Sequence, residues 1–269
     1  MNPFVRSITP IARGAGKAFS AFPVALACAL AFAVITMVRI QLDWPQQEAH
    51  NFLVNCLHWA TALGAVFSLA AVTAAQSRSG RRGAFWLANL LGIAVAAAAF
   101  ALLYRFGASD PDSLSHFPRL STLAAARAGA AIGISLIAFI LLAAHPPEQS
   151  GVARSLFMTQ KALFIALVYG LVIEGGASGV AGAVQALLYP EMSSKVYMHI
   201  GTIAGFLGFA VFVGYFPDFR RGQADPHRAA AQRQPRPVEV LLGYIVVPLA
   251  LALTAVLLLW TGRTVLVGM

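Results

Sequence analysis

The stretch AFWLANLLGIAVAAAAFALLY, residues 84–104, decides the fold class because it is long, apolar and free of charged side chains. A helix rises about 1.5 Å per residue, so about 20 apolar residues cross the roughly 30 Å hydrocarbon core of a bilayer. Arg81 and Arg82 precede the stretch and Arg105 follows it. Because the stretch is rich in alanine and leucine and lacks an alternation of period two, it is not typical of a barrel strand. We predict a transmembrane helix here.

Six further stretches have the same character, so the sequence predicts an all-α polytopic transmembrane bundle of about seven spans. We expect a cytoplasmic segment at residues 1–20, followed by a single integral membrane domain over residues 21–269 with a cytoplasmic polar loop at 218–237. The spans are expected near residues 21–40, 52–75, 84–104, 120–144, 160–186, 196–216 and 238–260. The fifth span is the least defined, since apolar residues run from Phe157 to Tyr189 and the sequence leaves open whether this helix is continuous.

Composition supports the membrane assignment. Hydrophobic residues make up 59% of the 269-residue chain and charged residues only 11%, whereas soluble domains carry about 25% charged residues. So few charges cannot cover the surface of a water-soluble protein of this size. The composition therefore excludes an ordinary cytosolic enzyme, a disordered chain and a nucleic-acid-binding domain, and it makes the lipid bilayer the first partner.

The basic residues predict the orientation, because lysine and arginine collect in cytoplasmic loops. Thirteen of them fall on one side of the predicted spans, five on the other, and Arg127 lies within the fourth span. The net charge of +9 is then an orientation signal and not a nucleic-acid footprint. We expect the N-terminus in the cytoplasm and the C-terminus outside. The thirteen are Arg6, Arg13, Lys17, Arg78, Arg81, Arg82, Arg154, Lys161, Arg220, Arg221, Arg228, Arg233 and Arg236.

The first span has a second interpretation. A basic start, an apolar run and the small-residue pattern Ala31-Phe32-Ala33 also resemble a cleavable secretory signal. We favour an uncleaved anchor because the apolar run continues to Val38.

A few polar residues within the spans are the candidate functional residues, because an ionisable side chain in a bilayer needs a partner or a purpose. Asn51, Asn55 and His58 follow i, i+4, i+7 spacing and predict a polar stripe on the second helix. We predict that Arg127 pairs with Glu174 in an outward-facing polar pocket, with this stripe nearby. A structural ion pair with interfacial histidines is the alternative. The predicted intramembrane cluster comprises Arg127, Glu174, His58, Asn55 and His199.

Three Gly-x-x-x-Gly motifs predict close helix packing in the fourth, fifth and sixth spans, because glycine lets helix backbones approach. A sliding or gating face is the alternative interpretation. The run from Gly175 to Gly179 indicates either a broken helix, as in transporters, or a packing surface. The motif residues are Gly129, Gly133, Gly175, Gly179, Gly201 and Gly205.

Signatures of catalysis and metal binding are absent from the sequence. We find no phosphate loop, no His-Glu-x-x-His and no nucleophile elbow. Cys28 and Cys56 lie in apolar stretches without metal-ligand spacing, and the Asp110/Asp112 pair is typical of a turn. We expect no cofactor and no metal.

Four features of the sequence occur together. They are an arginine-bearing fourth span, a long fifth helix, a sixth span that ends in Tyr215-Phe216-Pro217-Asp218-Phe219, and a last helix containing Tyr244 and Pro248. With these features much of the chain resembles a bacterial multi-pass membrane family known as domain of unknown function 4153. The resemblance implies a shortened, membrane-only form in the bacterial inner membrane, and it supplies no activity or catalytic residue.

These observations predict a non-enzymatic inner-membrane protein that serves as a binding or assembly component of the envelope, with a membrane-protein partner or a homo-oligomer as candidate assemblies. A transporter with a polar site around Arg127 and Glu174 is the alternative. A membrane-embedded enzyme is the third reading, disfavoured because no nucleophile stands beside a base.

Overall fold

The computed structural model describes residues 18–79, 81–109, 117–144, 151–187, 189–217, 219 and 258. The predicted span at 238–260, the loop at 218–237, the Asp110/Asp112 pair and residues 1–17 lie outside the described part of the chain, apart from residues 219 and 258. Residues 232–269 form a unit separate from the preceding chain, and the description below concerns the first unit alone.

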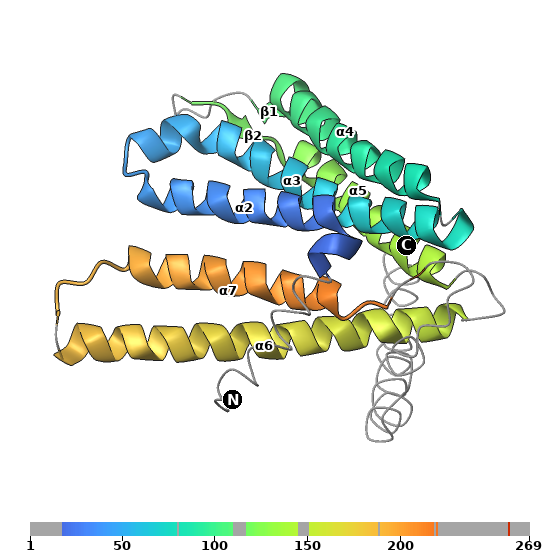
Figure 1. The fold of residues 1–269 in the computed structure, drawn as a ribbon. Helices are drawn as coiled ribbons and strands as arrows, with labels where there is room; N and C mark the ends of the chain where they lie inside the picture. The colour runs from blue at the N-terminus through green and yellow to red at the C-terminus, as the bar shows by residue number, and fades with distance from the viewer. Residues whose placement is uncertain are drawn as a thin grey trace, which may run out of the picture. The chain divides into compact units, whose positions relative to one another are not determined.

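Six long helices make up this unit (Figure 1), and each is long and apolar enough to cross a membrane. This arrangement confirms an all-α polytopic bundle and makes the chain a multi-pass membrane protein. Large apolar side chains cover the outward faces, including Ile134 and Phe164, which are 68% and 67% exposed. Such surfaces are typical of contact with lipid and not with water. The helices are α2 (Pro23–Gln41), α3 (Gln46–Arg78), α4 (Arg82–Phe106), α5 (Thr122–Ala143), α6 (Val152–Leu187) and α7 (Lys195–Gly214).

Short connections make successive helices antiparallel, so the unit has two ends. The end that carries Gln41, Gln46, Phe106, Thr122, Leu187 and Lys195 is here called the Arg39 end, and the opposite end is called the Arg82 end. At the Arg39 end, strand β1 (Ala108–Ser109) pairs antiparallel with strand β2 (Arg119–Leu120). This small ribbon is the one departure from the predicted all-helical chain among the described residues.

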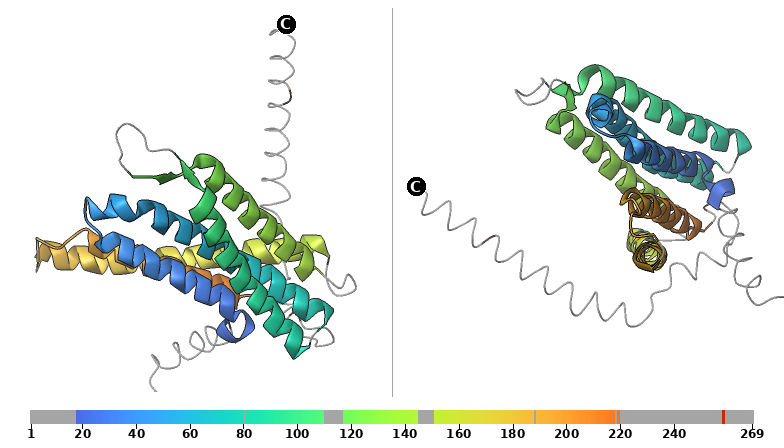
Figure 2. Two further views of the ribbon diagram at one scale, coloured as in Figure 1. Left: turned by 90° about the horizontal axis from the view of Figure 1, so that it is seen from above. Right: turned by 90° about the vertical axis from the view of Figure 1, so that its left-hand side faces the viewer.

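Helix α3 lies at the centre of the packing, because α2, α4 and α5 all contact it (Figure 2). Helices α6 and α7 form an antiparallel pair, and α7 also packs on α2. Helix α5 contacts α6 less extensively. There the Ser155 hydroxyl donates a 2.6 Å hydrogen bond to the carbonyl of Ile140, which joins the first turn of α6 to the last turns of α5.

The main apolar core lies at the Arg82 end. Phe139 of α5 is fully buried, and its ring packs against Phe216 and Phe219 at centroid distances of 4.8 and 6.2 Å. Edge-to-face geometry favours such ring pairs. The other large members of this core are Phe22, Leu26, Leu69, Val72, Met158, Phe212 and Val213.

The fifth predicted span is one continuous helix of 36 residues, α6. The interpretation of Gly175–Gly179 as a break is therefore wrong. In hydrocarbon a broken helix leaves backbone N–H and C=O groups without water to bind. The free energy lost through these unsatisfied groups exceeds the roughly 1 kcal/mol by which each glycine destabilises a helix.

Candidate functional site

Arg39 is the centre of a polar network at the Arg39 end. Its Nη2 donates a 2.8 Å hydrogen bond to Oδ1 of Asn51, and its Nη1 donates a 3.1 Å bond to Oδ1 of Asn55. Asn55 in turn donates to Asn51 Oδ1 at 3.1 Å. The i, i+4 spacing places both amides on one face of α3, toward the last turn of α2. The predicted stripe on α3 is thus real, and its partner is Arg39.

His58 extends this network one step deeper between the same two helices. Its Nε2 lies 3.0 Å from Oγ1 of Thr36, whose hydroxyl lies 2.8 Å from the carbonyl oxygen of Phe32. A hydroxyl has one proton, so when Thr36 donates it to that carbonyl, Nε2 of His58 must be the donor of the second bond. The imidazole also lies against the Phe32 ring at 4.6 Å. His58 is therefore held at a fixed depth by one donor bond and one ring contact.

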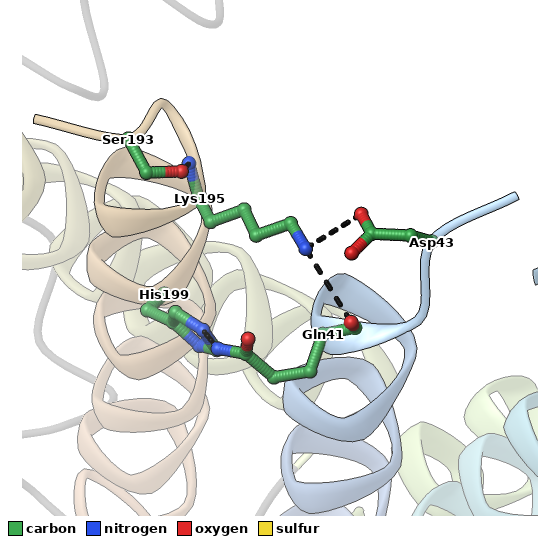
Figure 3. Close-up of polar contacts among 5 residues, drawn as sticks. All are labelled: Gln41, Asp43, Ser193, Lys195 and His199. Atoms are coloured by element: carbon green, nitrogen blue, oxygen red, sulfur yellow. Dashed lines mark hydrogen bonds and ion pairs between the residues drawn. The ribbon is translucent and has the colours of Figure 1, made fainter. Parts of the chain in front are cut away.

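Helix α7 contacts the same end of α2 through polar residues of its first two turns (Figure 3). The ammonium of Lys195 contacts Oδ1 of Asp43 at 2.8 Å and the carbonyl of Gln41 at 3.4 Å. The side-chain amide nitrogen of Gln41 lies 2.7 Å from Nε2 of His199. These contacts hold the beginning of α7 against the end of α2.

On the side of the network toward the Arg82 end, helices α2, α3 and α7 line an apolar cleft of about 430 Å³. Gly201 and Gly205 leave room on the α7 wall, and a Cβ added at Gly205 would meet no described atom within 4 Å. Thr36 lines the cleft and, through its hydroxyl, connects it to His58. The lining residues are Ala29, Phe32, Ala33, Thr36, Ala62, Ala65, Val66, Gly201, Thr202, Gly205, Phe206 and Phe209.

Among the described residues, no carboxylate forms an ion pair with Arg39. Both of its partners are neutral amides, and neither ion pair found in the described ranges, Arg119–Glu48 and Lys195–Asp43, includes it. The guanidinium carries five N–H groups, of which two point to the asparagines. Arg39 lies about one turn beyond Thr36, which lines the cleft, so this partly buried cation is placed to receive an anion there.

The predicted Arg127–Glu174 pair is not formed. Arg127 lies beside a cleft of α3, α4 and α5 that Trp59 also lines. Because His58 faces α2, and successive helix residues are turned by about 100°, α3 separates Arg127 from the polar stripe. Neither Arg127 nor Glu174 makes a hydrogen bond or ion pair with the described residues.

Glu174 instead lies against α7. Its Oε1 is 3.3 Å from the position that a Cβ on Gly201 would occupy, and Gly201 lines the apolar cleft. Gly201 follows the beginning of α7 by six residues, so this contact places Glu174 in the half of the bundle nearer the Arg39 end. The structure thus brings Asn55, His58 and His199 to one end with Arg39, places Glu174 near the cleft, and leaves Arg127 apart.

Helix packing uses glycines other than most of those predicted. No described atom lies within 4 Å of a Cβ built on Gly133, Gly175, Gly179 or Gly205, so the predicted tight contact at these positions is wrong for this unit. Gly129 contacts Trp59 and Gly201 contacts Glu174. The close approaches between helices occur at other glycines.

Helices α3 and α4 approach closely at Gly64 and Gly92. A Cβ on Gly64 would stand 2.7 Å from the Cβ of Ala96, and one on Gly92 would collide with Ser68. Gly170 and Gly208 lie at the contact between α6 and α7, where an added Cβ would stand 3.8 and 3.5 Å from the carbonyl oxygens of Ala204 and Ala166. None of these four glycines belongs to a Gly-x-x-x-Gly motif, so that motif does not predict them.

Arg39 is the residue of this candidate site that the sequence did not single out. It is one of the five basic residues on the predicted outer side, which bear only on orientation, and it lies in the last turn of α2. An available signal was its position within the predicted span 21–40, near the asparagine stripe across a short turn. No group of three or more histidine, cysteine, aspartate or glutamate side chains that would hold a metal ion occurs among the described residues.

Comparison with known proteins gives no further guide to the site. No protein-family model, no curated protein and no solved structure matches this chain. The resemblance to domain of unknown function 4153 therefore stays a prediction.

Proposed function

We propose that this protein is a non-enzymatic component of the bacterial inner membrane that binds an anionic amphiphile between α2, α3 and α7. The observation that carries the proposal is Arg39, a cation without a carboxylate partner among the described residues, about one turn beyond the apolar cleft. The inner-membrane location itself is supported by the family resemblance alone.

The dimensions and chemistry of the cleft support this ligand class. Small-molecule pockets measure about 300–1,000 Å³, and this cleft measures about 430 Å³. Its wall is apolar apart from Thr36 and Thr202, and the Thr202 hydroxyl bonds the carbonyl of Met198 in its own helix. Such a wall favours a hydrocarbon chain. A negative headgroup would then lie at Arg39, where the charge is uncompensated.

The Thr36–His58 contact supports a binding role better than a catalytic one. A nucleophilic hydroxyl must give its proton to the base, but the Thr36 proton is directed to the Phe32 carbonyl. No described carboxylate bonds the imidazole of His58 to orient it as a base. We therefore infer that Thr36 and His58 hold α2 and α3 together beside the ligand.

Photolabelling of the full chain in lipid nanodiscs tests the proposal. The probe is a long-chain fatty acid with a diazirine on its chain, and the labelled peptides are identified by mass spectrometry. We expect labelling of α2 and α7 in the wild type, and at least about a tenfold loss in Arg39→Gln, because charge-assisted hydrogen bonds contribute about 1.5–3 kcal/mol.

Gly205→Leu places a side chain in the cleft at a position where its Cβ meets no described atom within 4 Å, and it should abolish the same labelling. Gly133→Leu is the matched control, since a Cβ there also meets no described atom but points away from the cleft lining. The corresponding fatty alcohol, which lacks the negative charge, should label weakly. Equal labelling in the wild type, Arg39→Gln and Gly205→Leu would contradict the proposal.

Transport is the second candidate, and one observation favours it. Glu174 is a carboxylate in an apolar helix, without a described partner, beside a residue that lines the cleft. An ionisable residue at membrane depth is a candidate for a proton or substrate pathway. Loss of proton-coupled uptake of the same fatty acid in Glu174→Gln, with its binding retained, would favour a transporter over a binding protein.

A further inference from the structure

A second pocket lies at the opposite end of the unit and differs in chemistry. It measures about 490 Å³ and opens between the residues just before α2, the end of α3 and the beginning of α4. We call it the Gln76 pocket. Its lining residues are Ser20, Ala75, Gln76, Arg81, Arg82, Phe85 and Trp86.

Gln76 is the feature that indicates a ligand. Its side chain is only 5% exposed and lines the pocket, yet it makes no hydrogen bond with any described residue. An amide carries two donor hydrogens and an acceptor oxygen, and those of Gln76 are available to a molecule that enters the pocket. A ligand in the pocket would satisfy this group.

Two cations and a helix beginning give the pocket its electrostatic preference. Arg81 and Arg82 line it, both are exposed, and neither has an ion-pair partner in the described chain. Arg81 is also the N-cap of α4 and forms no side-chain cap, so the first N–H groups of that helix are open to an anion. The dipole of α4 and both guanidinium groups favour the same negative charge.

The distribution of carboxylates sharpens this preference. The four described acidic residues are Asp43, Glu48, Glu174 and Glu191, and all lie toward the Arg39 end. Lys195 and Arg119 are paired there. Arg81 and Arg82, at the Arg82 end, have no carboxylate partner among the described residues.

The aromatic residues point to a lipid as the source of that anion. Trp86 is 65% exposed and adjoins Phe85 in the first turn of α4. Tryptophan is enriched at the headgroup level of membranes, where one edge meets water and the other meets hydrocarbon. The pocket therefore opens at the depth where phospholipid phosphates lie.

We propose that the Gln76 pocket binds the phosphate of an anionic phospholipid, with Arg81, Arg82 and the beginning of α4 facing the phosphate oxygens and Gln76 completing the hydrogen bonds. This site is independent of the amphiphile cleft, because it uses other residues at the other end of the helices. It is a defined site for one headgroup and not a diffuse basic surface.

Lipid titration of the full chain in an uncharged detergent tests this proposal, with bound copies counted by native mass spectrometry. The probes are phosphatidylglycerol and phosphatidylcholine with the same chains. The wild type should bind phosphatidylglycerol more tightly. Arg81→Gln, Arg82→Gln and Gln76→Met should each weaken that binding by about tenfold, as expected for the loss of a charge-assisted or buried hydrogen bond.

Two controls separate this site from the alternatives. Arg154→Gln removes an exposed cation at the same end outside the pocket, and it should leave the affinity within about twofold. The loss in Arg81→Gln should persist when Arg39→Gln is also present, because the amphiphile cleft, which can hold the same lipid, is lined by neither Arg81 nor Gln76.

Two outcomes would overturn the proposal. The first is a loss in Arg154→Gln equal to that in Arg81→Gln, which indicates a diffuse basic surface. The second is displacement of the lipid by inorganic phosphate at equal affinity, which indicates a free phosphate ion. If Gln76→Met does not fold, as judged by size-exclusion chromatography, the exposed arginine variants decide the question.

Discussion

Replacing Phe139 by alanine tests the packing at the Arg82 end most directly. The side chain is fully buried and pairs with the rings of Phe216 and Phe219. In a membrane the unfolded helices remain in lipid, so the transfer of apolar surface from water contributes little to the difference between folded and unfolded states. Any loss of stability in Phe139→Ala must therefore come from lost packing contacts.

The magnitude follows from the two ring pairs. Each aromatic pair contributes about 0.5–1.5 kcal/mol beyond its buried area, so Phe139→Ala should lower the free energy of unfolding by about 1–3 kcal/mol before any cavity is counted. Phe139→Leu restores most of the volume without the ring, and it should fall between the wild type and Phe139→Ala.

The assay is reversible unfolding in mixed micelles with increasing dodecyl sulfate, followed by circular dichroism. Phe164→Ala is the matched control, because this phenylalanine is 67% exposed on α6 and has no ring partner among the described residues. Its unfolding midpoint should equal that of the wild type. Equal midpoints for Phe139→Ala and Phe164→Ala would refute the assignment of the core to the Arg82 end.

Three other predictions concern the rest of the unit. Gly64→Leu should destabilise the bundle by several kcal/mol in the same assay, because a Cβ there already stands 2.7 Å from α4, and a gain of stability would contradict the close approach. Asp43→Ala should change stability by less than about 1 kcal/mol, since its carboxylate is 80% exposed opposite Lys195. In intact cells a membrane-impermeant thiol reagent should label Trp44→Cys and not Ser79→Cys; the reverse result would invert the proposed orientation.

The spans were predictable because a run of about 20 residues without charge leaves few alternatives to a membrane helix. The lengths of the helices were less predictable. Helix α3 begins at Gln46, six residues before the expected boundary, since its first turns are polar and hydropathy does not distinguish a projecting polar helix from a loop. The seventh span lies outside the described residues and stays a prediction, as does the orientation.

The site was only partly predictable, for a geometric reason. Sequence gives the depth of a side chain along its helix, and sequence spacing gives its face, but neither tells which helix that face meets. Asn55 and His58 were found because i, i+4, i+7 spacing is visible in one helix. The pairing of Arg127 with Glu174 needed a contact between two helices, and α5 in fact directs Arg127 toward α3 and α4.

The unequal helix lengths have a consequence for the thickness of the host membrane. Helix α6 has 36 residues and extends about 54 Å, so it tolerates a thick bilayer without exposing its ends to hydrocarbon. Helix α2 has 19 residues, about 28 Å, which barely matches a typical bilayer. Arg39 stands in its last turn, so each ångström of added thickness draws this guanidinium toward hydrocarbon. The thickness of the membrane therefore acts on the hydration of Arg39, and through it on the strength with which the cleft holds a negative headgroup.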